Sequence, residues 1–343
     1  MQVNHEFPDA LPDVLPDTFS GPIPRNELKN RLNRIFFPYA DRQLQRISKK
    51  SRFAYYTNAE TARRILANEE IWMRDTYDMN DAMEIEYGFD CLHTAFDDDA
   101  LKSRFMAVLD DCAEGLAEEI LQRFDSWSPH LKTHTFIACV SKHRSRENHH
   151  GRLSMWRAYG GSSGVALILN AEAMLKISSR ALGAYSSPVG YMTAAQVRKE
   201  LRAVVRNMEE ARELLCSLGR ERVRDNVLSM LHYAVLCIKH PGFHEEREWR
   251  IITNAQWPEV AVRTSAIETI RDIPQKVQKI KFRDDPQNGL YGLGLPQLLN
   301  RVIIGPTASP QSLKEEFVAL LERAGVRHPG KKIVVSNIPL RCS

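Results

Sequence analysis

Two glutamates separated by one residue, Glu246 and Glu248, lie in the stretch FHEEREWRIIT that spans residues 243–253. The apolar residues around and after them predict a β-strand, in which side chains alternate between two faces. On that pattern Glu246, Glu248 and Arg250 share one face. Carboxylates have a low strand propensity and lose hydration when they are buried. A pair of them on one strand face therefore requires an explanation.

One explanation for the glutamate pair is chemical. A buried carboxylate stabilises positive charge that develops on a substrate, because electrostatic interactions are strong where water is excluded. A second carboxylate nearby could orient or deprotonate another reactant, and the pKa of one member would rise if both were desolvated. The other explanation is structural: the glutamates pair with neighbouring charges on a half-solvated face, where each exposed pair contributes about 0–1 kcal/mol. The residues by themselves leave both explanations open.

Residues 80–84, NDAME, hold a second group of oxygen-bearing side chains, Asn80, Asp81 and Glu84. These side chains could be metal ligands or contacts to a substrate. Alternatively, Asn80 and Asp81 begin a helix by accepting hydrogen bonds from its free amides, and Glu84 completes the cap. In either case we expect a loop here that leads into a short element.

The loop KHRSRENHHGR, residues 142–152, contains His143, His149, His150 and three arginines. Such a loop could contact nucleic acid or another phosphate, or belong to a histidine-containing metal nuclease. Adjacent histidines point apart, however, and the small residues that frame such nuclease sites are absent. We therefore expect a solvated, mobile loop, or a lid that selects an acceptor if a substrate cleft lies beside it.

Two aromatic residues of MWRAYG, Trp156 and Tyr159, lie three positions apart and so on one side of a helical turn. We expect Trp156 to pack in the core and Tyr159 to keep its hydroxyl in a polar cleft. The sequence GPTASP, residues 305–310, is typical of a strand-to-helix turn. That turn could bind an anion at the start of the helix, or be a plain turn.

Composition limits the class of protein. With 343 residues the chain can form one large domain or two modest ones. Its 47 basic and 43 acidic residues give a net charge of +4. This charge is too balanced to indicate nucleic-acid binding by overall field alone, although a local basic groove is compatible with it. No apolar stretch approaches the roughly 20 residues of a membrane span, so we expect no membrane partner.

The six cysteines form no CxxC pairs and have no zinc-type spacing, and we expect no signal peptide. We therefore expect reduced thiols and a cytoplasmic location. No cluster of histidine, cysteine or carboxylate residues has convincing ligand spacing, so no bound metal is expected.

The elements that position these residues have an α+β pattern. Residues 1–50 are expected to form a flexible, proline-rich arm and a leading helix, and residues 51–343 a single α+β domain. Strands are predicted at RFAYYT, IWMRD, TFIACVS, GVALILN, EWRIIT, KIKF, RVIIGP and KIVVS, and helices at 59–68, 98–126, 194–218, 221–239 and 310–324. Because these elements do not alternate regularly, we expect a mixed sheet with helical insertions.

Several of these segments, in this order, resemble a bacterial family, domain of unknown function 2971. The resemblance is carried by YYTNAETARRIL, IWMRDTYDMNDAMEIEYG, CVSKHRSRENHHGRLSMWRAYG, HEEREWRII, RVIIGPTASP and VVSNIPLR, and it covers roughly residues 52–342. The family name implies no function.

A weaker resemblance links the same layout to ADP-ribosyltransferases. These enzymes have an aromatic-threonine strand, a helix ending in Ile-Leu, a strand carrying serine and a late strand opened by E-x-E. The resemblance implies a split, mixed β-sheet that grips NAD, with the last glutamate of E-x-E catalytic. On that mapping Glu248 stabilises the ribose cation and Glu246 assists the acceptor.

The same resemblance implies a set of NAD contacts. Tyr56 and Tyr159 could stack on the nicotinamide, and Ser141 could hydrogen-bond the ribose. Arg74 or Arg52 could meet the pyrophosphate. The remaining cleft residues on this mapping are Tyr55, Thr57 and Asn80. Tyr55 stands where active transferases carry histidine or arginine, and a tyrosine brings no charge.

The function implied is an NAD-consuming ADP-ribosyltransferase or NAD glycohydrolase, acting as a toxin or defence effector. Its partners would be NAD as substrate, a protein or nucleic-acid acceptor, and an immunity or sensor partner. The first alternative is a non-enzymatic module that senses a nucleotide or protein on the same fold, which Tyr55 favours. The second is a metal-dependent nuclease that uses Asp81, Glu84, Glu246 and Glu248.

Overall fold

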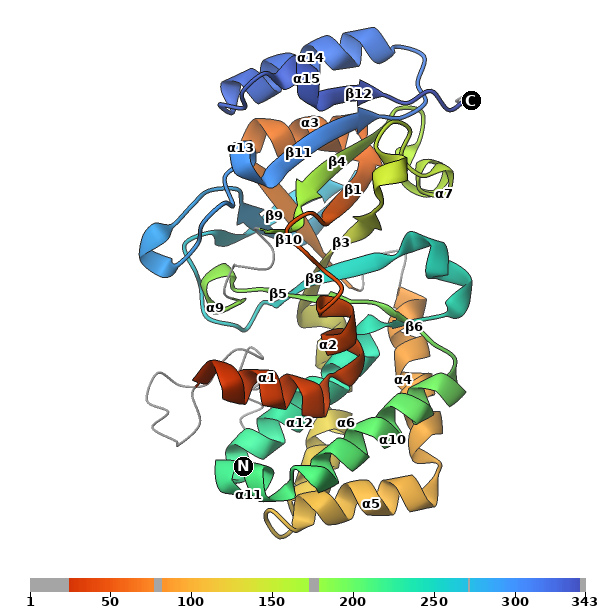
Figure 1. Ribbon diagram of the computed structural model, residues 1–343, viewed down its shortest axis with the longest axis vertical. Helices are drawn as coiled ribbons and strands as arrows, with labels where there is room; N and C mark the ends of the chain where they lie inside the picture. Colours follow the sequence, from red (N-terminus) through yellow and green to blue (C-terminus); the bar gives the residue numbers. More distant parts are fainter. Residues whose placement is uncertain (1–24, 77–81, 173–178, 271, 340–343) are drawn as a thin grey trace.

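The computed structural model describes residues 25–76, 82–172, 179–270 and 272–339 (Figure 1). The fold is α+β: a largely antiparallel, mixed sheet carries helices at both ends of the molecule. Its strands are β1 Arg52–Asn58, β2 Glu70–Asp75, β3 Thr135–His143, β4 Gly164–Asn170, β5 Tyr185–Pro188, β6 Gly190–Tyr191, β7 Ile238–Lys239, β8 Glu248–Asn254, β9 Arg263–Ile270, β10 Ile273–Lys281, β11 Leu299–Ile304 and β12 Ile333–Val335. The longer helices are α1 Arg25–Phe36, α3 Ala59–Asn68, α4 Ala82–Phe96, α5 Asp99–Asp110, α6 Leu116–His134, α10 Ala194–Glu210, α12 Arg220–Cys237 and α14 Pro310–Arg323.

The shorter helical elements connect these pieces. They are α2 Pro38–Leu44, α7 Leu153–Met155, α9 Ser179–Leu182, α11 Arg212–Leu218, α13 Leu295–Leu298 and α15 Pro329–Lys332, together with η1 Ser145–Glu147, the π-turn η2 Trp156–Gly160, η3 Pro241–Glu246 and η4 Pro286–Asn288. No helix in the described residues is long and apolar enough to cross a membrane.

The sheet opens beside β3, and this opening lies close to the candidate site. In the described chain the strand order is β12-β11-β4-β1-β3-β2-β10-β9, and β8 pairs with β3 and β5. One edge of β3 pairs with β8 from Thr135 to Ser141. The other edge is shared, because β1 pairs at Ser141–His143 and β2 at Phe136–Ile137. β1 and β2 therefore separate over residues 138–140 of β3.

The two larger hydrophobic cores of the described residues hold the sheet between its helical layers. The first joins α1, α4, α5, α6, α10 and α12 to one face of β3 and β8, and Figure 1 shows most of these helices gathered below the sheet. From Val227 to its end, helix α12 is apolar on nearly all sides, and Val227, Leu228 and Leu231 are fully buried. The second core packs α3 and α14 against the other part of the sheet.

Most predicted elements are confirmed within one to a few residues at their ends. Asn58 caps α3, and its side chain accepts a hydrogen bond from the Thr61 amide at 2.8 Å. The single helix predicted over 98–126 is wrong. It is divided into α5 and α6 by a turn that includes Gly115, whose φ of 71° lies in the left-handed region. One alternative for NDAME was the start of a helix, and α4 does begin at Ala82 with Glu84 in its first turn, but its 15 residues exceed the short element expected there. Strands β5 and β9 were not predicted.

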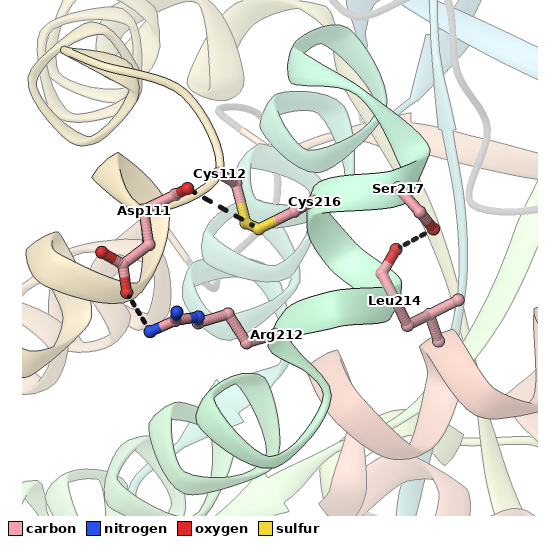
Figure 2. Close-up of a disulfide and its surroundings, with 6 residues drawn as sticks. All are labelled: Asp111, Cys112, Arg212, Leu214, Cys216 and Ser217. Atoms are coloured by element: carbon pink, nitrogen blue, oxygen red, sulfur yellow. Dashed lines mark hydrogen bonds and ion pairs between the residues drawn. A yellow bond between two sulfur atoms is a disulfide. The ribbon is translucent and has the colours of Figure 1, made fainter.

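The expectation of reduced thiols is wrong for Cys112 and Cys216, which form a disulfide (Figure 2). Cys112 lies in the turn between α5 and α6, and Cys216 lies in α11. A pair 104 residues apart has no local spacing motif, so only the packing of α11 against the turn brings the thiols together. Arg212 and Asp111 form an ion pair of 2.9 Å beside the disulfide. Cys91, Cys139 and Cys237 are free thiols.

Candidate functional site

Three glutamates converge on one buried lysine. The Nζ of Lys239 lies 2.5 Å from Glu84 Oε1, 2.7 Å from Glu246 Oε2 and 3.3 Å from Glu248 Oε2. Lys239 ends β7, directly after α12, and is 1% exposed. Glu84 comes from the first turn of α4, Glu246 from η3 and Glu248 from β8. An ammonium has three N–H donors, so each carboxylate can accept one.

Arg250 links two of these carboxylates from the sheet side. Its Nε donates to Glu248 Oε1 at 2.8 Å, and its Nη2 donates to Glu84. Its Nη1 donates to the backbone carbonyl of Leu236 at the end of α12. We call Glu84, Lys239, Glu246, Glu248 and Arg250 the Lys239 cluster. It contains three carboxylates and two cations, so one negative charge is in excess within it.

The charges in the cluster favour the ionised forms of Glu248, Lys239 and Arg250. Burial opposes ionisation of Glu248, but the adjacent positive charges of Arg250 and Lys239 outweigh burial and lower its pKa to about 2. Burial works against the charge of Lys239 too, yet Glu248 and Glu84 raise its pKa above its usual range. Burial likewise opposes the charge of Arg250, and Glu248 again reverses the effect and raises the pKa.

The two glutamates of E-x-E differ in exposure. The side chain of Glu248 is 5% exposed and that of Glu246 is 17% exposed. Tyr159 lies at the surface and donates its hydroxyl to Glu246 Oε1 at 3.1 Å. Phe243 is also exposed, and its ring centroid lies 4.8 Å from Lys239 Nζ. Glu246 is therefore the edge of the cluster that solvent and a ligand can reach, with an aromatic side chain on each side.

The predicted strand pattern holds for Glu248 and Arg250 but is wrong for Glu246. The strand begins at Glu248, and Glu246 ends the preceding η3 turn. Between them Arg247 has a φ of 47°, in the left-handed region. The two carboxylates still meet, because both reach Lys239 rather than because they alternate along one strand.

Ser141 supports the loop before β8. Its hydroxyl donates to the backbone carbonyl of Glu246, and it accepts a hydrogen bond from Arg152 Nη1 at 2.7 Å. The same nitrogen of Arg152 also donates to the carbonyls of Glu245 and Glu246. Ser141 is 2% exposed. Its contacts are therefore made to the protein, where they hold Glu246 in position.

The histidine- and arginine-rich loop 142–152 is anchored, in contrast to the mobile loop expected from its sequence. Glu147 is 4% exposed, and it accepts hydrogen bonds from the Arg144 amide at 2.9 Å and from Arg247 at 3.0 Å. Arg152 binds both of its oxygens. Burial opposes ionisation of Glu147, but the hydrogen bond from Arg152 contributes to a lowered pKa. One buried carboxylate therefore orders the loop.

Trp156 and Tyr56 belong to the core beside this loop. Trp156 is 2% exposed, as expected, and its Nε1 donates to the His150 carbonyl at 2.8 Å. Tyr56 packs edge-on against Trp156 at 4.9 Å between ring centroids. Burial raises the pKa of Tyr56 to about 12. Thr57 is 9% exposed and follows it in β1.

Tyr55 and Arg74 lie nearer to the opening of the sheet. Burial raises the pKa of Tyr55 to about 12, with a further contribution from Cys139 and an opposing one from Arg74. Cys139 is half-buried in β3, and its thiol forms a hydrogen bond with Glu248. Arg74 donates to the side chain of Gln275 at 3.0 Å. Asn80 and Asp81 lie outside the described residues.

The structure thus brings together Glu246, Glu248, Ser141 and Tyr159, with Tyr55 near Glu248 through Cys139. Tyr56 and Thr57 contribute to packing, and Arg74 lies toward the other end of β3. Sequence reasoning missed Lys239 as the centre of the site, and it missed Phe243 and Tyr191. The hydroxyl of Tyr191 accepts the amide hydrogen of Glu248 at 2.8 Å. The one sequence feature that could have indicated Lys239 was its position as a lone lysine directly after an apolar helix.

The described residues contain no group of three or more histidine, cysteine or carboxylate side chains arranged to hold a metal ion. In the Lys239 cluster, the ammonium of Lys239 lies where three carboxylates would otherwise converge on a cation.

Comparison with known proteins identifies a family for the part of the chain that carries this geometry. Residues 155–251 match the family described as protein of unknown function (DUF2971). The predicted resemblance to this family is confirmed over this segment, which is less than half of the chain. The DUF2971 segment contains Tyr159, Lys239, Glu246, Glu248 and Arg250, whereas Glu84 lies before it. No curated protein and no solved structure gave a significant match to the chain.

Proposed function

We propose that this protein consumes NAD, as an ADP-ribosyltransferase or as an NAD glycohydrolase, at the exposed edge of the Lys239 cluster. The observation that carries the proposal is the partly exposed carboxylate of Glu246, which lies in a cluster with one excess negative charge and is flanked by Tyr159 and Phe243. The E-x-E sequence at the start of a late strand and the opening between β1 and β2 also agree with the resemblance to a split transferase sheet.

The chemistry needs a negative charge where a sugar cation forms. In NAD the bond between ribose C1′ and the nicotinamide nitrogen breaks, and the electron pair leaves with neutral nicotinamide. The ribose becomes an oxocarbenium ion, and water or an acceptor then attacks C1′ and releases one proton. A preorganised negative charge in a site of low water content stabilises this cation.

The proposal gives the two glutamates different roles. Glu246 would contact the ribose hydroxyls and face the developing cation, because it is the reachable carboxylate. Glu248 would act on Lys239 and Arg250 and fix the position of both cations. Tyr159 and Phe243 would hold the nicotinamide ring between planar surfaces. This reverses the roles that the resemblance implies for Glu246 and Glu248.

A second candidate function is a non-enzymatic module that binds a nucleotide at the same edge. The observation that favours it is that both carboxylate oxygens of Glu248 already have cationic partners, Arg250 and Lys239. A catalytic glutamate held in this way would have to exchange a partner before it could contact ribose. Tyr55 also favours the binding module, because its side chain carries no charge.

One pair of measurements separates these two functions. NAD is incubated with the protein and free nicotinamide is quantified by chromatography, and the shift of the melting temperature with NAD is measured in parallel. Nicotinamide release supports the enzyme. A melting-temperature shift without release supports the binding module. If NAD causes neither nicotinamide release nor a melting-temperature shift, both functions are contradicted.

A further inference from the structure

Positive charge is concentrated in two segments of the chain that the proposed function does not use. Residues 46–52 and 142–152 together contain eight lysines and arginines and one acidic residue, Glu147. Over the whole chain the two kinds of charge are nearly equal, 47 basic against 43 acidic. The imbalance is therefore local, and a local concentration of cations is the electrostatic feature by which proteins attract polyanions.

The fold places these two segments side by side and adds two more arginines. In the pairing of β1 with β3, Arg52 lies opposite His143 and Phe53 lies opposite Lys142. The Lys142 amide donates to the Arg247 carbonyl at 2.9 Å, and Arg301 donates to the Asn148 carbonyl at 3.3 Å. We call eight of these ten cations the basic surface, leaving out Arg146 and Arg152; its members are Arg46, Lys49, Lys50, Arg52, Lys142, Arg144, Arg247 and Arg301.

The charge of the basic surface is largely uncompensated by its own contacts. Glu147 is buried and is already bound by Arg152 and Arg247. Arg52 donates to the carbonyls of Lys49 and Ser51, which are neutral acceptors. Arg301 likewise donates to the side-chain oxygen of Asn300 and a backbone carbonyl. These bonds position the guanidinium groups without removing their charge.

Burial and neighbouring cations lower the pKa of three members of the basic surface, Lys142, Arg301 and Arg247. Burial lowers the pKa of Lys142, and the neighbouring charges of Arg46 and Arg144 lower it further. Burial and the charge of Arg52 lower the pKa of Arg301. Burial and the charges of Arg152 and Arg144 lower the pKa of Arg247 against the opposing effect of Glu147. An anion bound here would relieve this repulsion.

Exposed aromatic rings lie at the border of the basic surface. Tyr159 donates to the side chain of Glu246, whose backbone precedes Arg247. Phe243 is in the same η3 turn as Glu246. Tyr159 is 43% exposed and Phe243 47% exposed. Cationic grooves bordered by exposed aromatic rings bind single-stranded nucleic acid, because the cations follow the phosphates and the rings stack on unpaired bases.

We propose that the basic surface binds the phosphate backbone of a single-stranded nucleic acid, whose bases stack on Tyr159 and Phe243. The inference rests on the charge distribution and on the exposed rings, and it holds whether or not the protein consumes NAD. The anchored loop 142–152 then serves as a fixed platform for Lys142 and Arg144.

The test measures binding of fluorescein-labelled single-stranded RNA and DNA of about 20 nucleotides by anisotropy, at salt concentrations from about 50 to 200 mM. Lys50→Glu with Arg144→Glu reverses two exposed charges of the basic surface. Lys102→Glu with Arg206→Glu makes the same change of net charge at exposed positions on α5 and α10. Lys49→Glu with Lys50→Glu is a second test variant if the first fails to fold.

We expect at least about tenfold weaker binding for the basic-surface variant, and a slope of log affinity against log salt that is smaller by about 1.4, or 0.7 for each lost contact. The control variant should bind within about twofold of wild type, since electrostatic effects beyond the screening distance are weak. Equal weakening in both variants, or no oligonucleotide binding by wild type at the lowest salt, would overturn the proposal. Binding to phosphatidylserine–phosphatidylcholine vesicles in place of the oligonucleotides would also overturn it.

Discussion

The ammonium of Lys239 lies 2.7 Å from the carboxylate of Glu246. This ion pair joins a fully buried cation to a carboxylate that solvent can reach. The interior side of Lys239 is held by Glu84 and Glu248, from α4 and β8. Contacts with the helical layer and with the sheet therefore position the exposed edge of the Lys239 cluster. The stability of the cluster and the chemistry proposed for Glu246 both depend on Lys239.

Replacing Lys239 by methionine should strongly destabilise the fold. Three carboxylates would lose their shared cation, and two of them, Glu84 and Glu248, are buried. Removing one partner of a buried ion network costs about 3–5 kcal/mol, because it leaves an unpaired charge in the interior. Urea unfolding measures the loss. Lys199→Met, at an exposed position of α10, is the matched control; a similar, small change in both variants would show that the cluster does not stabilise the fold.

The two glutamates of E-x-E should differ in their effect on stability. Arg250 and Lys239 hold the pKa of Glu248 near 2, against an ordinary value of 4.5. The ionised form is therefore favoured by about 3 kcal/mol, and Glu248→Gln should destabilise by an amount of that order. Glu246→Gln should cost about 1 kcal/mol or less, because its side chain is partly solvated and the cluster has excess negative charge.

Thermal and urea unfolding of both glutamine variants check this order. A melting temperature of Glu248→Gln equal to wild type, with Glu246→Gln strongly destabilised, would contradict the assignment of Glu248 as the buried organiser of the cluster.

His232 should make the fold sensitive to acid. Burial lowers its pKa from 6.5 to about 3, beside the rings of Trp127 and Phe124. Below pH 6.5 the unfolded chain binds a proton that the folded state does not take up until about pH 3. Above pH 6.5 His232 does not lower the free energy of unfolding. As the pH falls from 6.5 to about 3, it lowers the free energy of unfolding by up to about 1.4 kcal/mol per pH unit. His232→Phe should flatten the fall, measured by urea unfolding at several pH values; an unchanged slope would contradict the burial effect.

The disulfide between Cys112 and Cys216 should stabilise the helical layer. It closes a separation of 104 residues, and such a bond contributes about 2–4 kcal/mol, mainly by restricting the unfolded chain. Cys112→Ser should lower the free energy of unfolding by that amount without a reductant. In dithiothreitol the variant and wild type should be equally stable, which separates loss of the bond from loss of packing. Equal stability under both conditions would mean that the bond does not form in solution.

Much of the sheet could be predicted from the sequence, because short apolar runs with β-branched or aromatic residues mark β1, β3, β4, β8 and β11. The shared face of Glu248 and Arg250 was also predicted, since strand alternation alone puts both there, whereas their ion pair was not. The start of α4 at NDAME was one of two alternatives, because polar residues of this kind are typical both of a loop and of a helix cap, and the length of α4 was missed.

The site itself could be predicted only in part, since its centre depends on contacts between distant segments. Lys239 follows an apolar helix, and no local pattern pairs it with Glu84, which lies 155 residues earlier in the chain. Arg247 adopts a left-handed backbone that places Glu246 outside the strand, and nothing in its sequence demands this conformation. The disulfide was missed for the same reason, because it forms through tertiary packing.

The most direct test of the NAD proposal is the rate of nicotinamide release by wild type and by two matched variants, Glu246→Gln and Glu245→Gln, with water or a cell extract as the source of acceptor. Glu245 is the exposed neighbour of Glu246 and serves as the control. We expect release by wild type, unchanged release by Glu245→Gln, and a decrease of about 10²–10³-fold for Glu246→Gln with the fold intact. No release by folded wild-type protein, or equal rates for all three proteins, would contradict the account.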